Sequence, residues 1–133
     1  VFLGCKAAIP HLEATRGTIV NVASISGIGG DYLMSAYNAS KGAVVNFTRS
    51  LAVELGREGI TVNCICPGPL RTAITQRISE EHKTIYAKRR TALKRYGAPE
   101  EVAHITLSLC LPAASYITGA VIPVDGGLSI ERL

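Results

Sequence analysis

Tyr37 and Lys41 stand four residues apart in a segment whose apolar residues recur at helical spacing. On a helix, residues four apart leave the same face about one turn from each other, so the phenol and the ammonium group would be neighbours. A phenol has a pKa of about 10, and a nearby positive charge favours its phenolate form. Such a phenol could exchange a proton with an alcohol or a carbonyl oxygen. The alternative is a plain helix-surface pair, because two common residue types reach this spacing by chance.

A serine at the end of a preceding apolar run could complete a site with this pair. Ser24 closes the segment TIVNVAS, which has the composition of a strand. Ligands of open α/β sheets collect beyond the carboxyl ends of the strands, so the Ser24 hydroxyl could hold a substrate oxygen beside the phenol. The alternative for Ser24 is an ordinary turn serine that hydrogen-bonds its own backbone.

The elements that must position these residues alternate along the chain. Three short apolar runs predict buried strands of a parallel sheet: TIVNVAS (18–24), ITVNCIC (60–66) and AVIPV (120–124). Apolar spacing and end signals predict helices over 1–15 (loosely helical, and only as far as Pro10), 35–56 and 99–111, with one or two short helices in the polar segment 70–97. This alternation predicts an α/β fold with three parallel strands and flanking helices, which is one half of a doubly wound, Rossmann-like sheet.

Length and composition exclude several classes of protein. The 133 residues have room for one domain, and 47% hydrophobic with 18% charged residues favours a folded chain over a disordered one. A net charge of +4 is mild for a nucleic-acid binder, so we expect no nucleic-acid partner. The most apolar stretch, 105–124, is interrupted by Pro112 and Gly119, so we expect no membrane-spanning helix.

The cysteines and the basic residues also favour structural roles. The four cysteines are Cys5, Cys64, Cys66 and Cys110. Their CxC pair lies in a strand-like run, whereas zinc sites favour CxxC, so we expect no metal site and reduced core thiols in a cytoplasmic protein. The basic residues are Lys83, Lys88, Arg89, Arg90, Lys94 and Arg95. We expect them to form a solvated helix face near the mouth of the substrate site.

Several motifs occur in a fixed order along the chain. A strand ends in Ser24, Tyr37 follows thirteen residues later, and Lys41 lies within YNASKGAV. Further segments in this order are LAVEL (51–55), GITVNCICPG (59–68), PGPLRT (67–72), RYGAPEEVA (95–103) and ITGAVIPVDGG (117–127). Together they resemble the short-chain dehydrogenase/reductase (SDR) family, and the resemblance covers nearly the whole chain.

The resemblance implies a role for each residue that matches a family motif. Tyr37 would be the catalytic acid/base, Lys41 would lower its pKa and bind the nicotinamide ribose, and Ser24 would orient the substrate carbonyl. The residues that would line the nicotinamide end of the site are Pro67, Gly68, Leu70 and Thr72, although a plain strand-ending turn also explains the PGP sequence. The implied activity is NAD(P)-dependent oxidoreduction of a small secondary alcohol or ketone, by a homodimer or homotetramer.

Some motifs of the family have no counterpart in the sequence. These are its glycine-rich TGxxxGxG turn, the residue that selects NAD or NADP, its NNAG strand, and a helix asparagine of its proton relay. We therefore expect residues 1–133 to be the C-terminal half of one SDR domain whose dinucleotide-binding half lies upstream of Val1. The alternative is a truncated, catalytically inactive binding or assembly module.

The resemblance leaves two substrate branches open. The segment GIGGDYLMSAYNASKGAVVNFTR resembles the branch of acetoin/diacetyl reductases and butanediol dehydrogenases. The branch of 3-oxoacyl-carrier-protein reductases shares most of the same blocks. We expect the segment 70–97 to decide the shape of the substrate site.

Overall fold

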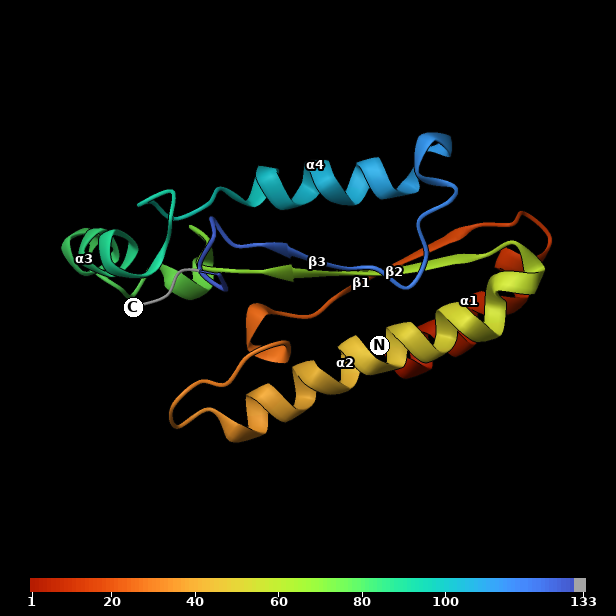
Figure 1. The fold of residues 1–133 in the computed structure, drawn as a ribbon, viewed down its shortest axis with the longest axis horizontal. Helices are drawn as coiled ribbons and strands as arrows, with labels where there is room; N and C mark the ends of the chain where they lie inside the picture. The colour runs from red at the N-terminus through yellow and green to blue at the C-terminus, as the bar shows by residue number, and fades with distance from the viewer. Residues whose placement is uncertain (131–133) are drawn as a thin grey trace.

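The structure is a computed structural model, and it describes residues 1–130. Three parallel strands form one sheet: β1 (Thr18–Val22), β2 (Thr61–Pro67) and β3 (Val121–Val124). They lie in the order β1-β2-β3, so β2 is the central strand (Figure 1). Because the strands are parallel, all three end at the same edge of the sheet.

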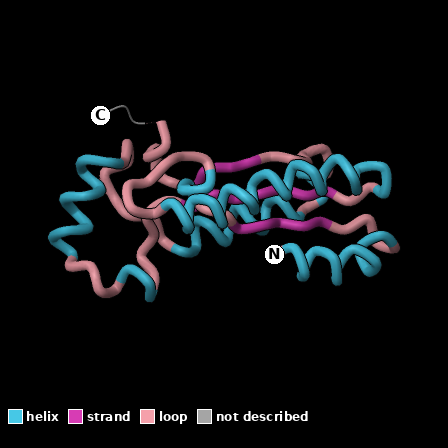
Figure 2. Tube along the Cα trace, turned by 90° about the horizontal axis from the view of Figure 1, so that it is seen from below, coloured by secondary structure: helices cyan, strands magenta, loops and turns pink. Residues whose placement is uncertain are grey.

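The described residues form four α-helices, of which three flank the sheet on its two faces (Figure 1). The four helices are α1 (Phe2–Glu13), α2 (Ser35–Leu55), α3 (Glu80–Arg90) and α4 (Pro99–Cys110). In Figure 1, α1 and α2 lie on one side of the sheet, α4 lies on the other, and α3 lies beyond the carboxyl ends of the strands. Figure 2 shows the three strands side by side from a second direction. The predicted α/β class, with three parallel strands and flanking helices, is confirmed.

The core has a larger and a smaller cluster, both on the side of α2. The buried residues of the larger cluster are Cys5, Ile19, Leu51, Ala52, Leu55, Ile60 and Val62. The smaller cluster, near the carboxyl ends of the strands, contains Ala23, Val45, Cys64 and Cys66. Ala23 precedes Ser24, and Val45 lies one turn after Lys41, so this packing fixes the end of β1 against the helix that carries Tyr37 and Lys41.

A buried polar chain joins α1, β1 and α2. The Asn21 side chain donates from Nδ2 to Thr48 Oγ1 at 3.0 Å, and Thr48 Oγ1 donates to the Val44 carbonyl at 2.9 Å. The Cys5 thiol donates to Asn21 Oδ1 at 3.5 Å. Buried polar groups are costly without partners, so these contacts favour one register of α2 on the sheet.

Three local expectations were wrong. The segment 18–24 was expected to be buried on both faces, but the strand ends at Val22, whose side chain is 48% exposed, because β1 is an outer strand of the described sheet. Helix α1 continues through Pro10 to Glu13, since Leu12 packs against the larger core cluster. Cys110 is exposed, because it ends α4 outside both clusters, whereas the other three thiols are buried.

None of the described helices combines the length and the apolar character needed to cross a membrane.

Candidate active site

The structure brings Tyr37 and Lys41 together in the first two turns of α2. Lys41 Nζ lies 5.8 Å from the centroid of the Tyr37 ring and donates a hydrogen bond to the Val22 carbonyl at 3.4 Å. An ammonium group at this distance is attracted by the electrons of the ring. The Tyr37 side chain is 43% exposed, so it is accessible to a ligand. Lys41 therefore links the phenol to the carboxyl end of β1.

Ser24 lies at the predicted strand end, two residues beyond β1, and is buried. Its hydroxyl oxygen accepts a hydrogen bond from the Ser26 N–H at 3.1 Å and caps the short 3₁₀ helix η1 (Ile25–Gly27). This is the ordinary turn contact considered above as the alternative. Within residues 1–130, Ser24 has no hydrogen bond to Tyr37 or Lys41. The hydroxyl still has its own proton to donate.

Two glycines set the distance between η1 and α2. A Cβ atom at Gly27 would lie 2.7 Å from the carbonyl oxygen of Lys41 and 2.8 Å from its carbonyl carbon, which is closer than such atoms approach. The facing helix residue, Gly42, also lacks a side chain, and a Cβ there would meet the Gly27 carbonyl oxygen at 3.6 Å. Only glycine at position 27 lets the segment after Ser24 pack directly on the turn that carries Lys41.

Asn38 holds the loop that connects Ser24 with Tyr37. Its Nδ2 donates to the Gly29 carbonyl at 3.1 Å and, at a longer 3.4 Å, to Asp31 Oδ2. Its Oδ1 is buried and has no hydrogen-bond partner in the described part of the chain. The sequence interpretation missed both Gly27 and Asn38. A glycine and an asparagine in a polar loop are common, and their function depends on contacts across the loop.

The thiol of Cys66 is hydrogen-bonded to the Ser24 backbone and lies within the electrostatic influence of Lys41. Burial, and to a lesser extent the neighbouring Cys64 thiol, raise the pKa of Cys66 to about 11. A hydrogen bond from the Ser24 backbone and the positive charge of Lys41 act in the opposite direction. The thiol therefore stays protonated at neutral pH, which makes it a poor nucleophile. Because Pro67 follows Cys66 directly, the hydrogen bond to the Ser24 backbone also places the start of the PGP sequence near Ser24.

The loop after β2 packs on the end of β3. The Gly68 N–H donates to the Val124 carbonyl at 3.0 Å, and a Cβ atom at Gly68 would lie only 2.6 Å from Asp125 Cβ. Leu70 forms a single parallel β-bridge with Gly97. The hydrogen bonds of this bridge are donated by the N–H groups of Arg71 and Gly97, not by that of Leu70. That N–H has no hydrogen-bond partner within residues 1–130, and the residue is half-buried. It is thus available to an amide-bearing ligand.

The other predicted lining residue, Thr72, begins the segment that leads to α3. Its N–H donates to Thr75 Oγ1 at 3.0 Å, and that hydroxyl donates in turn to the Leu70 carbonyl at 2.8 Å. These bonds fix the turn through Leu70 and leave Thr72 half-buried. The four expected lining residues therefore follow one another along the edge where β2 and β3 end, after Cys66, which is hydrogen-bonded to the Ser24 backbone.

An ion-pair network ties α3 to this loop. Glu80 binds Arg71 Nη1 at 2.6 Å and Lys83 Nζ at 2.8 Å. The hydrogen bond from Lys83 has the largest effect and that from Arg71 the next largest, and together they hold the pKa of Glu80 below its usual range. The side chain of Lys83 is only 8% exposed, so its placement on a solvated face was wrong. Its long stem is covered while its charged end reaches Glu80.

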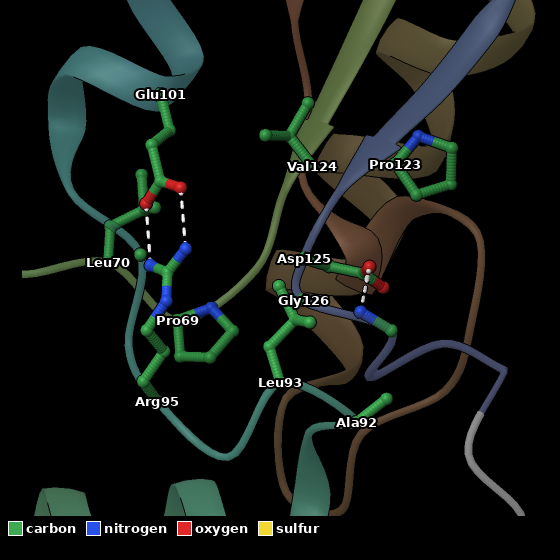
Figure 3. Close-up of a pocket in the computed structure, with 12 residues that line it drawn as sticks. Pro69, Leu70, Ala92, Leu93, Arg95, Glu101, Pro123, Val124, Asp125 and Gly126 are labelled. Carbon is green, nitrogen blue, oxygen red and sulfur yellow. Dashed lines mark hydrogen bonds and ion pairs between the residues drawn. The ribbon is translucent and has the colours of Figure 1, made fainter.

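A cavity of about 410 Å³ lies beside the same loop, as Figure 3 shows. Arg95 binds both Glu101 oxygens at 2.7 Å each, and Glu101 Oε2 also accepts the Ala98 N–H at 2.8 Å. The hydrogen bonds from Arg95 lower the pKa of Glu101 to about 2. The lining includes neither Tyr37 nor Lys41, so this cavity is separate from their pair.

Among residues 1–130, no group of three or more His, Cys, Asp or Glu side chains could hold a metal ion.

Comparison with known proteins identifies the family. A family model described as enoyl-(acyl carrier protein) reductase matches residues 1–129, and its family is that of the short-chain dehydrogenases/reductases. The chain belongs to the SDR family. This SDR chain is 47% identical over 122 residues to meso-2,3-butanediol dehydrogenase of Serratia marcescens, covering 92% of the chain and 48% of that relative. It is 45% identical over 128 residues to the 3-oxoacyl-[acyl-carrier-protein] reductase of Mus musculus, covering 96% and 52%.

Solved structures agree with this assignment. A 3-oxoacyl-[acyl-carrier protein] reductase from Brucella melitensis superposes with a TM-score of 0.89 at 33% identity, covering 98% of this chain and 49% of that one. A 4-hydroxyisoleucine dehydrogenase complexed with NADH gives a TM-score of 0.91 at 30% identity, covering 98% and 55%. The SDR chain thus spans about half the length of the relatives it matches. The family resemblance drawn from the motifs is confirmed.

Proposed function

We propose that the protein containing this chain is a NAD(P)-dependent oxidoreductase that interconverts a secondary alcohol and a ketone. The observation that carries the proposal is the contact between Tyr37 and Lys41 at the edge where the parallel strands end. The names of the two sequence relatives, a butanediol dehydrogenase and a 3-oxoacyl reductase, describe chemistry at an alcohol and at a ketone. Those relatives are about twice as long as this chain, so the activity is proposed for the whole natural polypeptide.

The residues at this edge fit a nicotinamide cofactor. When bound, NAD or NADP would accept or supply the hydride. Lys41 uses one of its three protons on the Val22 carbonyl, so two are left for ribose hydroxyls. The Leu70 N–H, which has no hydrogen-bond partner among residues 1–130, could bind the carboxamide. Thr72, two residues further along the same loop, offers a hydroxyl group. Solved relatives with bound NADH and NADPH support either dinucleotide.

The chain's own residues would move the proton. In the reducing direction, Tyr37 Oη donates its proton to the ketone oxygen, which becomes the alcohol, and in the oxidising direction it accepts that proton. The Lys41 ammonium group stabilises the phenolate left by the first transfer. Ser24 orients the substrate through its remaining hydroxyl proton, and the tight packing at Gly27 holds it beside α2.

The test is Tyr37→Phe in the natural polypeptide. Turnover of a ketone with NADH or NADPH should fall at least about a hundredfold, because general acid catalysis contributes that much. Dinucleotide affinity, measured by fluorescence titration, should stay unchanged. The matched control is Tyr116→Phe, which removes a phenol hydroxyl from a residue that is 100% exposed and lines none of the described cavities. Turnover within a few fold of the wild type in Tyr37→Phe would refute the role of Tyr37.

The titration also separates the two classes of function. If the natural polypeptide gives no saturable signal with either dinucleotide, the oxidoreductase proposal is wrong and the binding or assembly module is favoured.

We further propose a cytoplasmic protein, because its four free cysteines suit a reducing compartment. A homodimer or homotetramer is proposed from the family resemblance, and light scattering of the purified polypeptide would measure it.

A further inference from the structure

Two hollows meet beside the loop that connects Ser24 with Tyr37. The first, of about 430 Å³, is lined in part by Ile25, Ile28 and Leu128. The second, of about 590 Å³, lies between the loop and α3. Asp31 and Arg90 line both hollows. Tyr37 and Lys41 line neither hollow, but Ile25 directly follows Ser24, so the first hollow begins next to the residue proposed to orient the substrate.

Arg90 offers an unneutralised positive charge to both hollows. Within residues 1–130 the Arg90 guanidinium group forms no ion pair and no hydrogen bond, whereas the side chains of Arg71 and Arg95 each bind a glutamate. The Asp31 carboxylate lies more than 4.0 Å from the Arg90 nitrogens, and its Oδ2 accepts a hydrogen bond from Asn38 at 3.4 Å. Arg89 lines the second hollow as well, so two guanidinium groups face one carboxylate.

The chemistry of these linings defines a substrate class. A guanidinium group is a planar fork whose paired N–H groups match the oxygens of a carboxylate or a phosphate. The apolar residues Ile25, Ile28 and Leu128 suit a short carbon chain between that anion and the reacting carbon. We propose that Arg90 selects a ketone or alcohol that carries an anionic carboxylate or phosphate group. This inference rests on the proposed function, because it concerns the same reaction.

Helix stability offers a competing explanation for the charge. Lys88, Arg89 and Arg90 fill the last turn of α3, where positive charges interact favourably with the helix dipole. That explanation applies equally to Lys88, which lines neither hollow. Lys88→Gln is therefore the matched control, because it removes the same charge from the same turn.

The experiment compares three ketones of equal chain length in the natural polypeptide: a 2-oxo carboxylate, a phosphorylated ketone and a neutral diketone. The wild type should prefer one or both anionic ketones, and their KM should rise with salt. Arg90→Gln should raise KM for the preferred anionic ketone by about tenfold or more, with kcat and the KM of the neutral diketone unchanged. Arg90→Lys should restore only part of this loss, and Lys88→Gln should change nothing.

A second readout does not depend on turnover. The hydroxy product of the preferred anionic ketone should raise the thermal midpoint of the wild type and of Lys88→Gln, but not that of Arg90→Gln. Equal effects of Arg90→Gln on neutral and anionic ketones, or the same loss in Lys88→Gln, would overturn the inference. A wild type that turns over no ketone with either dinucleotide would refute the proposed function itself, and this inference with it.

Discussion

At the scale of single residues, the bidentate pair of Arg95 and Glu101 has the clearest dependence on pH. Arg95 donates to both carboxylate oxygens, and the Ala98 N–H adds a third hydrogen bond. These bonds are made to the ionised carboxylate, which is why the pKa of Glu101 lies near 2. The pair therefore stabilises the folded state only while Glu101 is charged.

Glu101→Gln should lower the stability of the natural polypeptide at neutral pH. The folded-state pKa of Glu101 is depressed to about 2 from an ordinary value of 4.5, so its stabilisation is fully present above pH 4.5 and is lost as pH falls towards 2. The difference in urea midpoint between wild type and Glu101→Gln should close over that range. Glu100→Gln, in the same exposed helix turn, is the control, and an equal pH-dependent difference there would contradict the role of the pair.

Individual site residues differ in how far the sequence could predict them. The contact between Tyr37 and Lys41 follows from helix geometry, because side chains four residues apart share a face. The hydroxyl contact of Ser24 and the paired, buried position of Lys83 depend on a turn and on a neighbouring acid that no spacing rule specifies. Arg90 could be recognised as charged, but not as part of the lining of two hollows. That position depends on how the end of α3 lies against a loop that precedes Arg90 by at least 56 residues (90 − 34).

At the scale of elements, the contact between η1 and α2 positions the candidate site. Gly27 and Gly42 allow the two backbones to approach, and the smaller core cluster packs the same region from below. The three strands and the long helix were predictable because their apolar periodicity is local. The close approach at Gly27 was not, because the atoms that exclude a side chain there belong to Lys41, fourteen residues further along the chain.

Gly27→Ala should damage both stability and catalysis. Its methyl group would meet the Lys41 backbone at 2.7 Å, and a helix backbone cannot move aside cheaply. Overpacking of this kind costs about 1–3 kcal/mol of unfolding free energy, and the displaced Ser24 segment should lower turnover. Urea unfolding and ketone reduction would measure the two effects.

The control for that variant is Gly30→Ala, in the same loop. A Cβ atom at Gly30 meets nothing within 4 Å, and the backbone there is not left-handed. This substitution should change the unfolding free energy by less than about 0.5 kcal/mol. If both variants behave alike, the loop tolerates side chains generally and the contact with α2 does not position Ser24.

At the scale of the whole molecule, the parallel sheet gathers every candidate group at one edge. Ser24 follows β1, while Pro67 and Gly68 lie at the end of β2, and α2 carries Tyr37 and Lys41 to the same edge. Groups from segments far apart in sequence therefore form one surface, as ligand sites of open α/β sheets do. A ligand that touches several of them should stabilise the fold as a unit.

NADH or NADPH should raise the thermal midpoint of the natural polypeptide. A ligand at about 100 times its Kd stabilises the folded state by about 2.7 kcal/mol. Lys41→Ala should reduce this gain and raise Kd about tenfold or more, because charge-assisted bonds to the ribose are lost. Differential scanning fluorimetry with each dinucleotide would measure both effects and show which one is preferred. An unchanged Kd in Lys41→Ala would contradict the ribose contact.

The central position of β2 has a consequence for synthesis of the chain. The partners of β2 on the β3 side arrive late, since Cys64 pairs with Val121, which follows it by 57 residues (121 − 64). At translation rates of 5–20 residues per second, this edge of the nascent strand stays unpaired for about 3–11 s. Its apolar TVNCICP sequence is then open to pairing with another chain. Pairing with the four residues of β3 should therefore lower the tendency of the nascent chain to aggregate.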